Sequence, residues 1–344
     1  MSRHRMTAGL GLAAALLGVA AAGAVKAGDG KDRPAVYKGC QEASGAVSLG
    51  SHHFVVASDE DNILRVYEVT REEPIATIDL DAKLADPKES EAKKRKVDIE
   101  ASTVVGGVSL WIGSHSRTTK KGKLRPGRFR LFALDVSAEK PGEAKFLGDY
   151  RRLLHDMIAA DKGWGLGLGA AFGGLNQATS KPGPKDRGGF NIEGLSVLPD
   201  GKTVYIGLRN PLSMTRKPRG EALLIPLENP LALVKGEASR ATFGRPVRLD
   251  LAGRGVRSIE WSPHHKAFLI VAGDWGPNKQ PWQLYTWSGG RADAPTRVRT
   301  PVAERRLNPE ALIVFAGSSQ IQLLSDEGGD AGKRRFRSLR LKVD

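Results

Sequence analysis

Short apolar runs separated by turn residues recur along most of this chain. The clearest unit is NIEGLSVLPDGKTVYIGLRN at residues 191–210, where two apolar segments flank a Pro-Asp-Gly turn. Residues 63–69 alternate apolar and polar side chains, as a half-buried strand does. Runs of this kind, bounded by Gly, Pro, Asn and Asp, predict β-strands joined by tight turns.

Five copies of this unit can be recognised. In each copy a Glu opens the first strand, and the second strand ends in a polar tip. Successive glutamates are 58, 93, 67 and 50 residues apart, and periods near 50 are typical of propeller blades. The glutamates are Glu42, Glu100, Glu193, Glu260 and Glu310, and the tips are Asp59, His115, Arg209 with Asn210, Asp274 and Asp326.

The repeat predicts an all-β fold, a single β-propeller domain over residues 36–344 with about five to six blades. Five blades are visible, and a sixth, poorly marked or built from both termini, stays open. Residues 148–189 break the rhythm, because Tyr150, Leu153, Leu154, Met157 and Ile158 are spaced like one face of a helix. We therefore predict a helical insertion in this region. The glycine-rich loop after it lacks the G-x-G-x-x-G spacing of a dinucleotide site.

The first residues are typical of a secretory signal peptide. Arg3 and Arg5 precede an apolar run over residues 6–23, and small residues around Lys26 offer a cleavage site. We expect residues 1–27 to be removed and the protein to be periplasmic or secreted, with no transmembrane segment left. A retained membrane anchor is the alternative, but the run is short and alanine-rich for a spanning helix.

Charge and composition limit the partners. The 344 residues carry a formal charge of +15 and 40% hydrophobic residues, enough for a core. A basic protein favours an anionic or small-molecule partner. The basic residues are not interleaved with aromatics, so no nucleic acid partner is expected. The lone Cys40 cannot form an internal disulfide, and we predict that it is a small buried residue. We expect the protein to be a monomer.

A propeller would bring the five glutamates to one mouth of the domain. Carboxylates at short range resist joint ionisation, so cations or N–H donors must relieve them. Oxygen ligands suit calcium, and Glu193, Glu260 and Glu310 are its candidate ligands. The alternative is a structural role, in which each Glu holds neighbouring blades in register. No zinc-like His spacing exists. His115 is a candidate general base without an identified nucleophile.

These motifs resemble the bacterial family called domain of unknown function 3616 over about residues 36–330. The resemblance is carried by Glu42-Ala43-Ser44, Ser58-Asp59-Glu60-Asp61-Asn62, Trp111-Ile112-Gly113-Ser114-His115, Asn191-Ile192-Glu193-Gly194-Leu195, Gly207-Leu208-Arg209-Asn210-Pro211, Arg257-Ser258-Ile259-Glu260 and Asn308-Pro309-Glu310-Ala311-Leu312. More loosely, Glu193-Gly194 is similar to the strand opening of β-propeller phytases and calcium-dependent lactonases, which implies calcium binding by acids near the propeller axis.

Three functions stay open. The first is an exported binding protein whose mouth, with aromatics such as Trp275 and Trp282, takes a ligand or partner. The second is a calcium-dependent hydrolase of phosphate esters, other esters or lactones, in which Arg209 steadies the developing anion. The third is a basic envelope-associated protein that binds anionic polymers. The tip Arg209-Asn210-Pro211 beside Glu193 is the first place to look for a site.

Overall fold

The computed structural model describes residues 34–40, 42–85, 96–137, 139–276, 280–298, 307–327 and 334–343. They lie in the compact unit Arg33–Asp344. The predicted signal peptide, residues 1–27, lies outside the described residues. Among those described, no helix combines the length and the apolarity needed to span a membrane.

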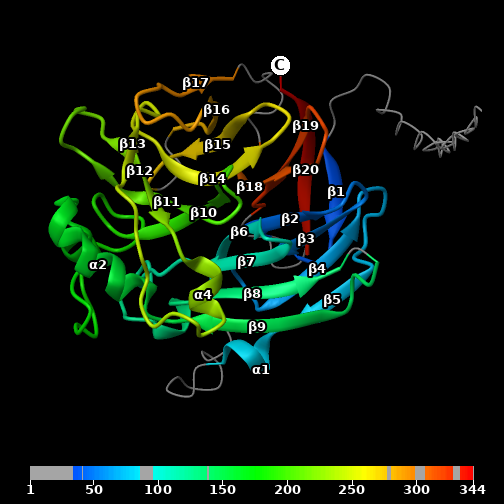
Figure 1. Ribbon diagram of the computed structural model, residues 1–344, viewed down its shortest axis with the longest axis horizontal. Coiled ribbons are helices and arrows are strands. Elements are labelled where there is room, and N and C mark those ends of the chain that lie inside the picture. The colour runs from blue at the N-terminus through cyan, green and yellow to red at the C-terminus, as the bar shows by residue number, and fades with distance from the viewer. Residues whose placement is uncertain are drawn as a thin grey trace, which may run out of the picture. The chain divides into compact units, whose positions relative to one another are not determined.

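Five four-stranded antiparallel sheets make up the described unit, and each sheet is one blade of a propeller. Figure 1 shows the first strands of the blades around the centre and the outer strands at the periphery. Blade 1 contains β2 (Gly45–Leu49), β3 (His53–Ala57), β4 (Ile63–Glu68) and β5 (Ala76–Asp79). Blade 2 contains β6 (Ile99–Val105), β7 (Val108–Gly113), β8 (Leu131–Val136) and β9 (Ala144–Tyr150). Blade 3 contains β10 (Asn191–Val197), β11 (Val204–Ser213), β12 (Glu221–Leu227) and β13 (Val247–Leu249).

The remaining blades complete the ring. Blade 4 contains β14 (Gly255–Ser262), β15 (Ala267–Gly273), β16 (Gln283–Trp287) and β17 (Thr296–Arg297). Blade 5 contains β18 (Pro309–Val314), β19 (Gln320–Ser325), β20 (Arg335–Lys342) and, as its outermost strand, β1 (Ala35–Lys38). Strand β1 pairs with β20, so the two ends of the described chain lie side by side (Figure 1). The predicted β-propeller is confirmed, and the described residues form five blades, the last of which is built from both termini.

Apolar side chains fill the spaces between neighbouring blades. Five hydrophobic clusters can be distinguished, and each draws its residues from two adjacent blades. Strands in the middle of a blade are covered on both faces, which explains runs such as Phe54-Val55-Val56-Ala57, all of them buried. Because each blade is a meander of antiparallel strands, no helical crossover is needed within a blade.

The predicted helical insertion lies between β9 and β10. It holds α2 (Leu153–Trp164) and α3 (Leu168–Phe172), at the left of Figure 1. Leu153, Leu154 and Met157 are buried against the cluster between blades 2 and 3. Tyr150, predicted as part of the helix, instead ends β9. The other helical segments are α1 (Asp81–Leu84), α4 (Pro230–Val234) and the short 3-10 turn Pro126–Arg128.

The start of the first strand in four blades carries a β-bulge. Pairing is interrupted between Ile99 and Ala101, and likewise at the equivalent positions of β10, β14 and β18. A bulge leaves one residue unpaired and can re-aim its side chain. The residues at the four bulges are Glu100, Glu193, Arg257 and Glu310.

The expected equivalence of Glu260 with the other glutamates therefore does not hold. In blade 4 the bulge residue is Arg257, and Glu260 is a paired residue further along β14, opposite Leu269. A small residue follows the bulge residue in each blade, Ser258 in blade 4, whereas Trp261 follows Glu260. This sequence signal would have identified Arg257.

Candidate functional site

A polar cavity of about 270 Å³ lies where the bulge residues of several blades meet. We call this cavity the mouth. Eight carboxyl groups and four cationic side chains line it, so it is acidic within a basic protein. The carboxyl groups are those of Glu42, Asp59, Glu60, Asp98, Glu100, Glu193, Glu310 and Asp326, and the cations are Lys96, Arg128, Lys185 and Arg209.

One side of the mouth, formed by blades 3 to 5, joins its acids to buried arginines. We call it the arginine half: Glu193, Arg209, Arg257 and Glu310. Arg209 Nη1 donates to Glu193 Oε1 over 2.7 Å, and Arg257 Nε lies 2.9 Å from Glu193 Oε2. Arg257 also forms an ion pair with Glu310. Arg257, on the first strand of blade 4, thus bridges carboxylates at the first strands of blades 3 and 5.

These arginines keep Glu193 ionised. Burial by itself would raise the pKa of Glu193, but the charges of Arg209 and Arg257 outweigh burial and hold the pKa below its ordinary value. Asn191 Nδ2 is a second donor to Oε1, beside Arg209 Nη1, over 2.8 Å. A buried carboxylate with two guanidinium partners and an amide donor is a structural ion cluster, in which removing one partner is costly.

The opposite side of the mouth, formed by blades 1 and 2, crowds carboxyl groups together. We call it the acidic half: Glu42, Asp59, Glu60, Asp98 and Glu100. One carboxylate oxygen from each of Asp59, Asp98 and Glu100 lies within 4.8 Å of the others, and the same holds for Glu42, Asp59 and Glu60. Asp59 belongs to both groups, so it stands at the centre of this half.

The acids at the centre of the acidic half have raised pKa values, which favours their protonated forms. Burial, a hydrogen bond with Glu42 and the charge of Asp98 raise the pKa of Asp59 to about 9. Burial, together with the charges of Asp98 and Glu193, raises the pKa of Glu100 well above its ordinary value. Asp59 Oδ1 is buried and has no hydrogen-bond partner among the described residues.

Two cations form ion pairs in the acidic half, one with Glu60 and one with Asp98. Lys96 Nζ pairs with Glu60 Oε1 over 2.8 Å, and this carboxylate is more than half exposed. Arg128 Nη1 pairs with Asp98 Oδ2 over 3.0 Å. Neither cation forms an ion pair with Asp59 or Glu100 in the described structure. Asp59 and Glu100 therefore have only other carboxyl groups at short range within the Asp59, Asp98 and Glu100 group.

Asn191 faces both halves. Its amide nitrogen must point to Glu193, because an ionised carboxylate only accepts hydrogen bonds. The amide oxygen is then turned away from Glu193, and it is buried without a hydrogen-bond partner among the described residues. Asn191 is 4% exposed and lines the mouth. This residue of the cavity wall therefore carries an oxygen without a hydrogen-bond partner among the described residues.

The other predicted site residues lie in different places. Glu260 does not line the mouth; its pKa is raised well above the ordinary value by burial, and Thr103 Oγ1 donates to it over 3.3 Å. His115 is fully buried and stacks on Phe129, and burial lowers its pKa to about 4. It does not line the mouth. Cys40 is buried, and burial raises the pKa of its thiol to about 12.

Of the polar residues predicted at the ends of the second strands, some line the mouth and others lie beside it. Asp59, Arg209 and Asp326 line the mouth. The carbonyl oxygen of Asp274 accepts a hydrogen bond from Arg209 Nε over 2.9 Å. Asn210 Nδ2 donates to the carbonyl oxygens of Pro184 and Asp186. These two tips therefore hold loops beside the mouth.

The carboxylate and amide oxygens of the mouth bear on the calcium site expected from the sequence. Glu193 and Glu310 are bridged by Arg257, and Glu260 lies elsewhere, so these three residues do not form a cation site. Asp59, Asp98 and Glu100, with the free oxygen of Asn191 in the same cavity, do fit a hard cation that takes oxygen ligands. Sequence reasoning missed Asp98 and Asn191, although both stand two residues before a predicted Glu.

Comparison with solved structures gives low similarity across most of the chain. Glutaminyl cyclase from Myxococcus xanthus is 12% identical, with a TM-score of 0.44 and coverage of 90% of this chain and 95% of that one. Aldose sugar dehydrogenase from Streptomyces coelicolor is 11% identical, with a TM-score of 0.41 and coverage of 90% and 99%. A putative oxidoreductase (glucose dehydrogenase) from Thermus thermophilus is 13% identical, with a TM-score of 0.43 and coverage of 89% and 100%. Likeness at this level carries no inference about activity.

Among curated proteins, none matches this chain. A family model does match part of it, and the matched residues include Glu193, the tip Arg209-Asn210-Pro211, Arg257 and Glu310. Residues 175–317 match the family described as "Protein of unknown function (DUF3616)", so the resemblance predicted from the sequence is confirmed over these residues.

Proposed function

We propose that this protein is a binding protein whose mouth takes a hard divalent cation, Ca²⁺, at the acidic half. The observation that carries the proposal is the contrast within one cavity. The acids of the arginine half are neutralised by buried guanidinium groups, whereas carboxylate oxygens of Asp59 and Glu100 lie within 4.8 Å of one another and of Asp98, and these two acids form no ion pair among the described residues and have raised pKa values.

A cation would replace protons on these two acids. Metal ligands bind in their deprotonated form, so binding to Asp59 and Glu100 releases protons and strengthens as the pH rises. Asp98 and Asn191 supply further oxygens in the same cavity. Calcium accepts six to eight oxygen ligands and tolerates irregular geometry, with water completing the shell. The mixture of carboxylate, amide and water oxygens favours calcium over softer metals.

The hydrolase alternative has less support from the geometry. Its proposed anion-stabilising group, Arg209, already donates hydrogen bonds to Glu193 and to the carbonyl oxygens of Asp274 and Gly276. Its candidate general base, His115, packs on Phe129 away from the cavity. A binding role requires neither residue to act on a substrate.

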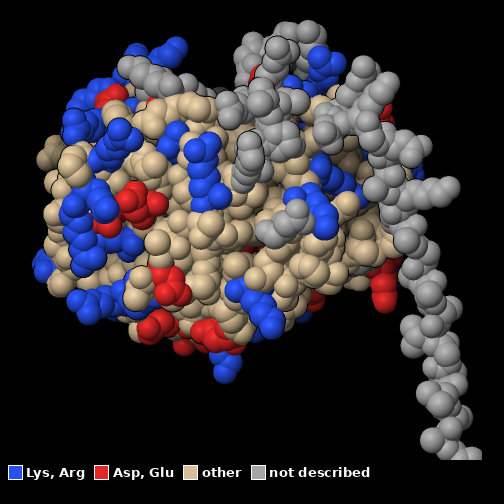
Figure 2. Space-filling view, turned by 90° about the horizontal axis from the view of Figure 1, so that it is seen from above, with Lys and Arg blue, Asp and Glu red and all other residues tan. Residues whose placement is uncertain are grey.

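The alternative of adhesion to anionic polymers requires one continuous basic face. Figure 2 shows Lys and Arg side chains spread over the face it presents, with groups of Asp and Glu between them. The mouth itself has twice as many carboxyl groups as cations. We therefore propose a specific cation site rather than a general electrostatic surface.

Calorimetric titration with calcium chloride tests the proposal. Wild-type protein should bind calcium saturably, and the affinity should suit the millimolar calcium outside cells, with a Kd of about 10⁻⁴ to 10⁻³ M or tighter. Asp59→Asn should weaken binding by about tenfold or more, because it removes the central charge. The matched control is Asp135→Asn, an exposed residue of β8 in blade 2. No binding by wild type, or equal binding by Asp59→Asn, would refute the proposal.

Export is a separate part of the proposal and rests on the sequence alone. The Arg3 and Arg5 charges with the apolar run that follows support a cleaved signal peptide. Mass spectrometry of the protein from a fractionated bacterial host should find a mature chain that lacks residues 1–27 outside the cytoplasm. Recovery of the uncleaved chain from the cytoplasm alone would contradict export.

A further inference from the structure

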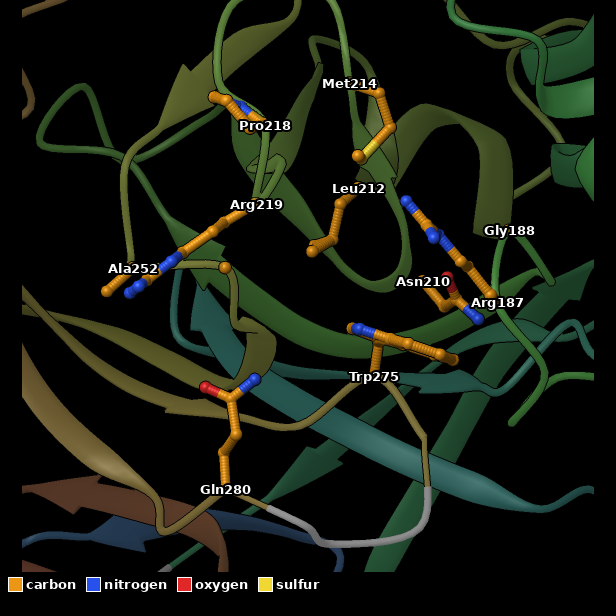
Figure 3. Close-up of a pocket in the computed structure, with 11 residues that line it drawn as sticks. Arg187, Gly188, Asn210, Leu212, Met214, Pro218, Arg219, Ala252, Trp275 and Gln280 are labelled. Carbon is orange, nitrogen blue, oxygen red and sulfur yellow. The ribbon is translucent and has the colours of Figure 1, made fainter.

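A second and larger hollow, of about 550 Å³, lies beside the mouth over blades 3 and 4. Figure 3 shows Leu212 and Trp275 between two arginines, Arg187 and Arg219, that lie at opposite sides. Met214 stands at the rim, and it is 48% exposed, which is unusual for a large apolar side chain in this protein. The volume falls within the range of small-molecule pockets.

Among the residues that the structure describes, neither Arg187 nor Arg219 makes an ion pair or a side-chain hydrogen bond. Both are exposed. Guanidinium groups pair with carboxylate or phosphate in a planar, two-pronged geometry, so two unpaired ones across a partly apolar hollow favour an oxyanion-bearing ligand.

The loops that form the hollow are fixed from the tip of β11. Arg209 Nε donates to the carbonyl oxygen of Asp274 and Arg209 Nη2 to that of Gly276, so the two residues on either side of Trp275 are held. Asn210 Nδ2 donates to the carbonyl oxygens of Pro184 and Asp186, over 3.1 and 2.6 Å, just before Arg187. Two consecutive buried side chains thus position the aromatic surface and one of the arginines. A pocket whose walls are fixed in advance loses less entropy when a ligand binds.

We propose that this pocket binds a small organic oxyanion with a flat apolar body. The body packs on Trp275 and Leu212, because aromatic surfaces stack and bury apolar area well. Carboxylate or phosphate groups of the ligand pair with Arg187 and Arg219. Because the arginines lie at opposite sides of the hollow, a ligand with an anionic group at each end satisfies both.

This pocket is distinct from the cation site. Asn210 and Trp275 line it, and none of Asp59, Asp98 or Glu100 does. The inference goes beyond calcium binding and stands without it. Titrations in the presence of a chelator and in the presence of calcium therefore separate failure of one proposal from failure of the other.

Calorimetric titration of the mature full-length chain with three probes tests the inference. Terephthalate carries carboxylates at both ends of a ring, phenyl phosphate carries one phosphate, and terephthalamide is the neutral analogue of the first. We expect saturable binding of terephthalate, weaker binding of phenyl phosphate, and no binding of terephthalamide. Tighter binding of phenyl phosphate would identify phosphate as the preferred oxyanion and would also support the inference.

A double variant, Arg187→Gln with Arg219→Gln, should weaken anion binding by about tenfold or more, because it removes two charge-assisted contacts. Both side chains are exposed, so folding should be retained. The matched control is Arg216→Gln, an exposed arginine of the same loop that does not line the pocket. No binding of either anion, equal binding of terephthalamide, or an equal loss in Arg216→Gln would overturn the inference.

Discussion

The two halves of the mouth use the same residue type at equivalent places and give it opposite states. Glu193 and Glu100 are both bulge residues at the start of a first strand. Both are buried, but the charges of Arg209 and Arg257 lower the pKa of Glu193, whereas burial, together with the charges of Asp98 and Glu193, raises the pKa of Glu100. The neighbouring charges, rather than the repeat itself, decide the direction of the pKa shift.

The two halves differ in the role of their acids, which the sequence leaves open between a structural role and a ligand site. In the arginine half the acid joins neighbouring blades through Arg257, which reaches both Glu193 and Glu310. In the acidic half no such bridge reaches Asp59 or Glu100 among the described residues. Repeated acids can therefore be structural in one part of a propeller and available to a ligand in another.

The largest expected effect comes from breaking the arginine half. Glu193→Gln leaves Arg209 and Arg257 buried without their shared carboxylate. Removing one partner of a buried ion cluster costs about 3–5 kcal/mol of unfolding free energy, and urea denaturation of the purified variant measures it. The control is Glu60→Gln, since Glu60 is more than half exposed and should change stability by less than about 1 kcal/mol. A loss below about 1 kcal/mol in Glu193→Gln would show that the cluster is not structural.

A smaller effect is expected in how the free energy of unfolding depends on pH, and the sign of this dependence differs between the two halves. In the absence of calcium, the raised pKa of Asp59 means that the folded state holds a proton that the unfolded state has released between about pH 4 and 9. The stability contribution of Asp59 is therefore complete below about pH 4 and is lost as the pH rises through about 9. Glu193, whose pKa is lowered, contributes stability above the ordinary Glu range and loses it on acidification.

Thermal unfolding across this pH range checks the second prediction. Asp59→Asn should flatten the decline of stability from neutral to alkaline pH, by roughly 1–2 kcal/mol at the alkaline end. Asp135→Asn, exposed on β8, serves again as the control and should leave the slope unchanged. Identical pH profiles for wild type and Asp59→Asn would mean that Asp59 titrates normally.

The smallest effect is expected at Glu260, which belongs to neither half. Burial raises its pKa well above the ordinary value, which favours the neutral, protonated form, and its hydrogen-bond partner is Thr103. A neutral acid and Gln have similar size and polarity. Glu260→Gln should therefore change the free energy of unfolding by less than about 1 kcal/mol near pH 7. A loss as large as that of Glu193→Gln would show that Glu260 is ionised and paired.

Much of the fold follows from local patterns in the sequence. The spacing of apolar runs and turns predicts the propeller, and the helical spacing of Leu153, Leu154 and Met157 predicts the insertion, because both depend on residues near each other in the chain. The pairing of β1 with β20 joins the two ends of the unit, and no local pattern specifies it. For this reason the sequence predicts five to six blades rather than an exact number.

The site is less predictable, because it depends on neighbours in space. Glu260 matches the spacing of the repeat, yet the bulge of blade 4 falls at Arg257, whose side chain pairs with Glu193 and Glu310. Asp98 and Glu60 join the acidic half only because blades 1 and 2 bring their strand ends together. The opposite pKa shifts of Glu100 and Glu193 arise from burial and from charges on other blades, which the sequence does not show.

Proton release on calcium binding tests the central claim most directly. Calcium chloride is added to the metal-free protein in weakly buffered solution near neutral pH, and the base needed to hold the pH is measured. Because the pKa of Asp59 is raised to about 9 and that of Glu100 is raised as well, wild type should release about one proton or more per calcium bound. Asp59→Asn should release less, and Asp135→Asn should match wild type. Calcium binding without any proton release would contradict the assignment of the cation to the acidic half.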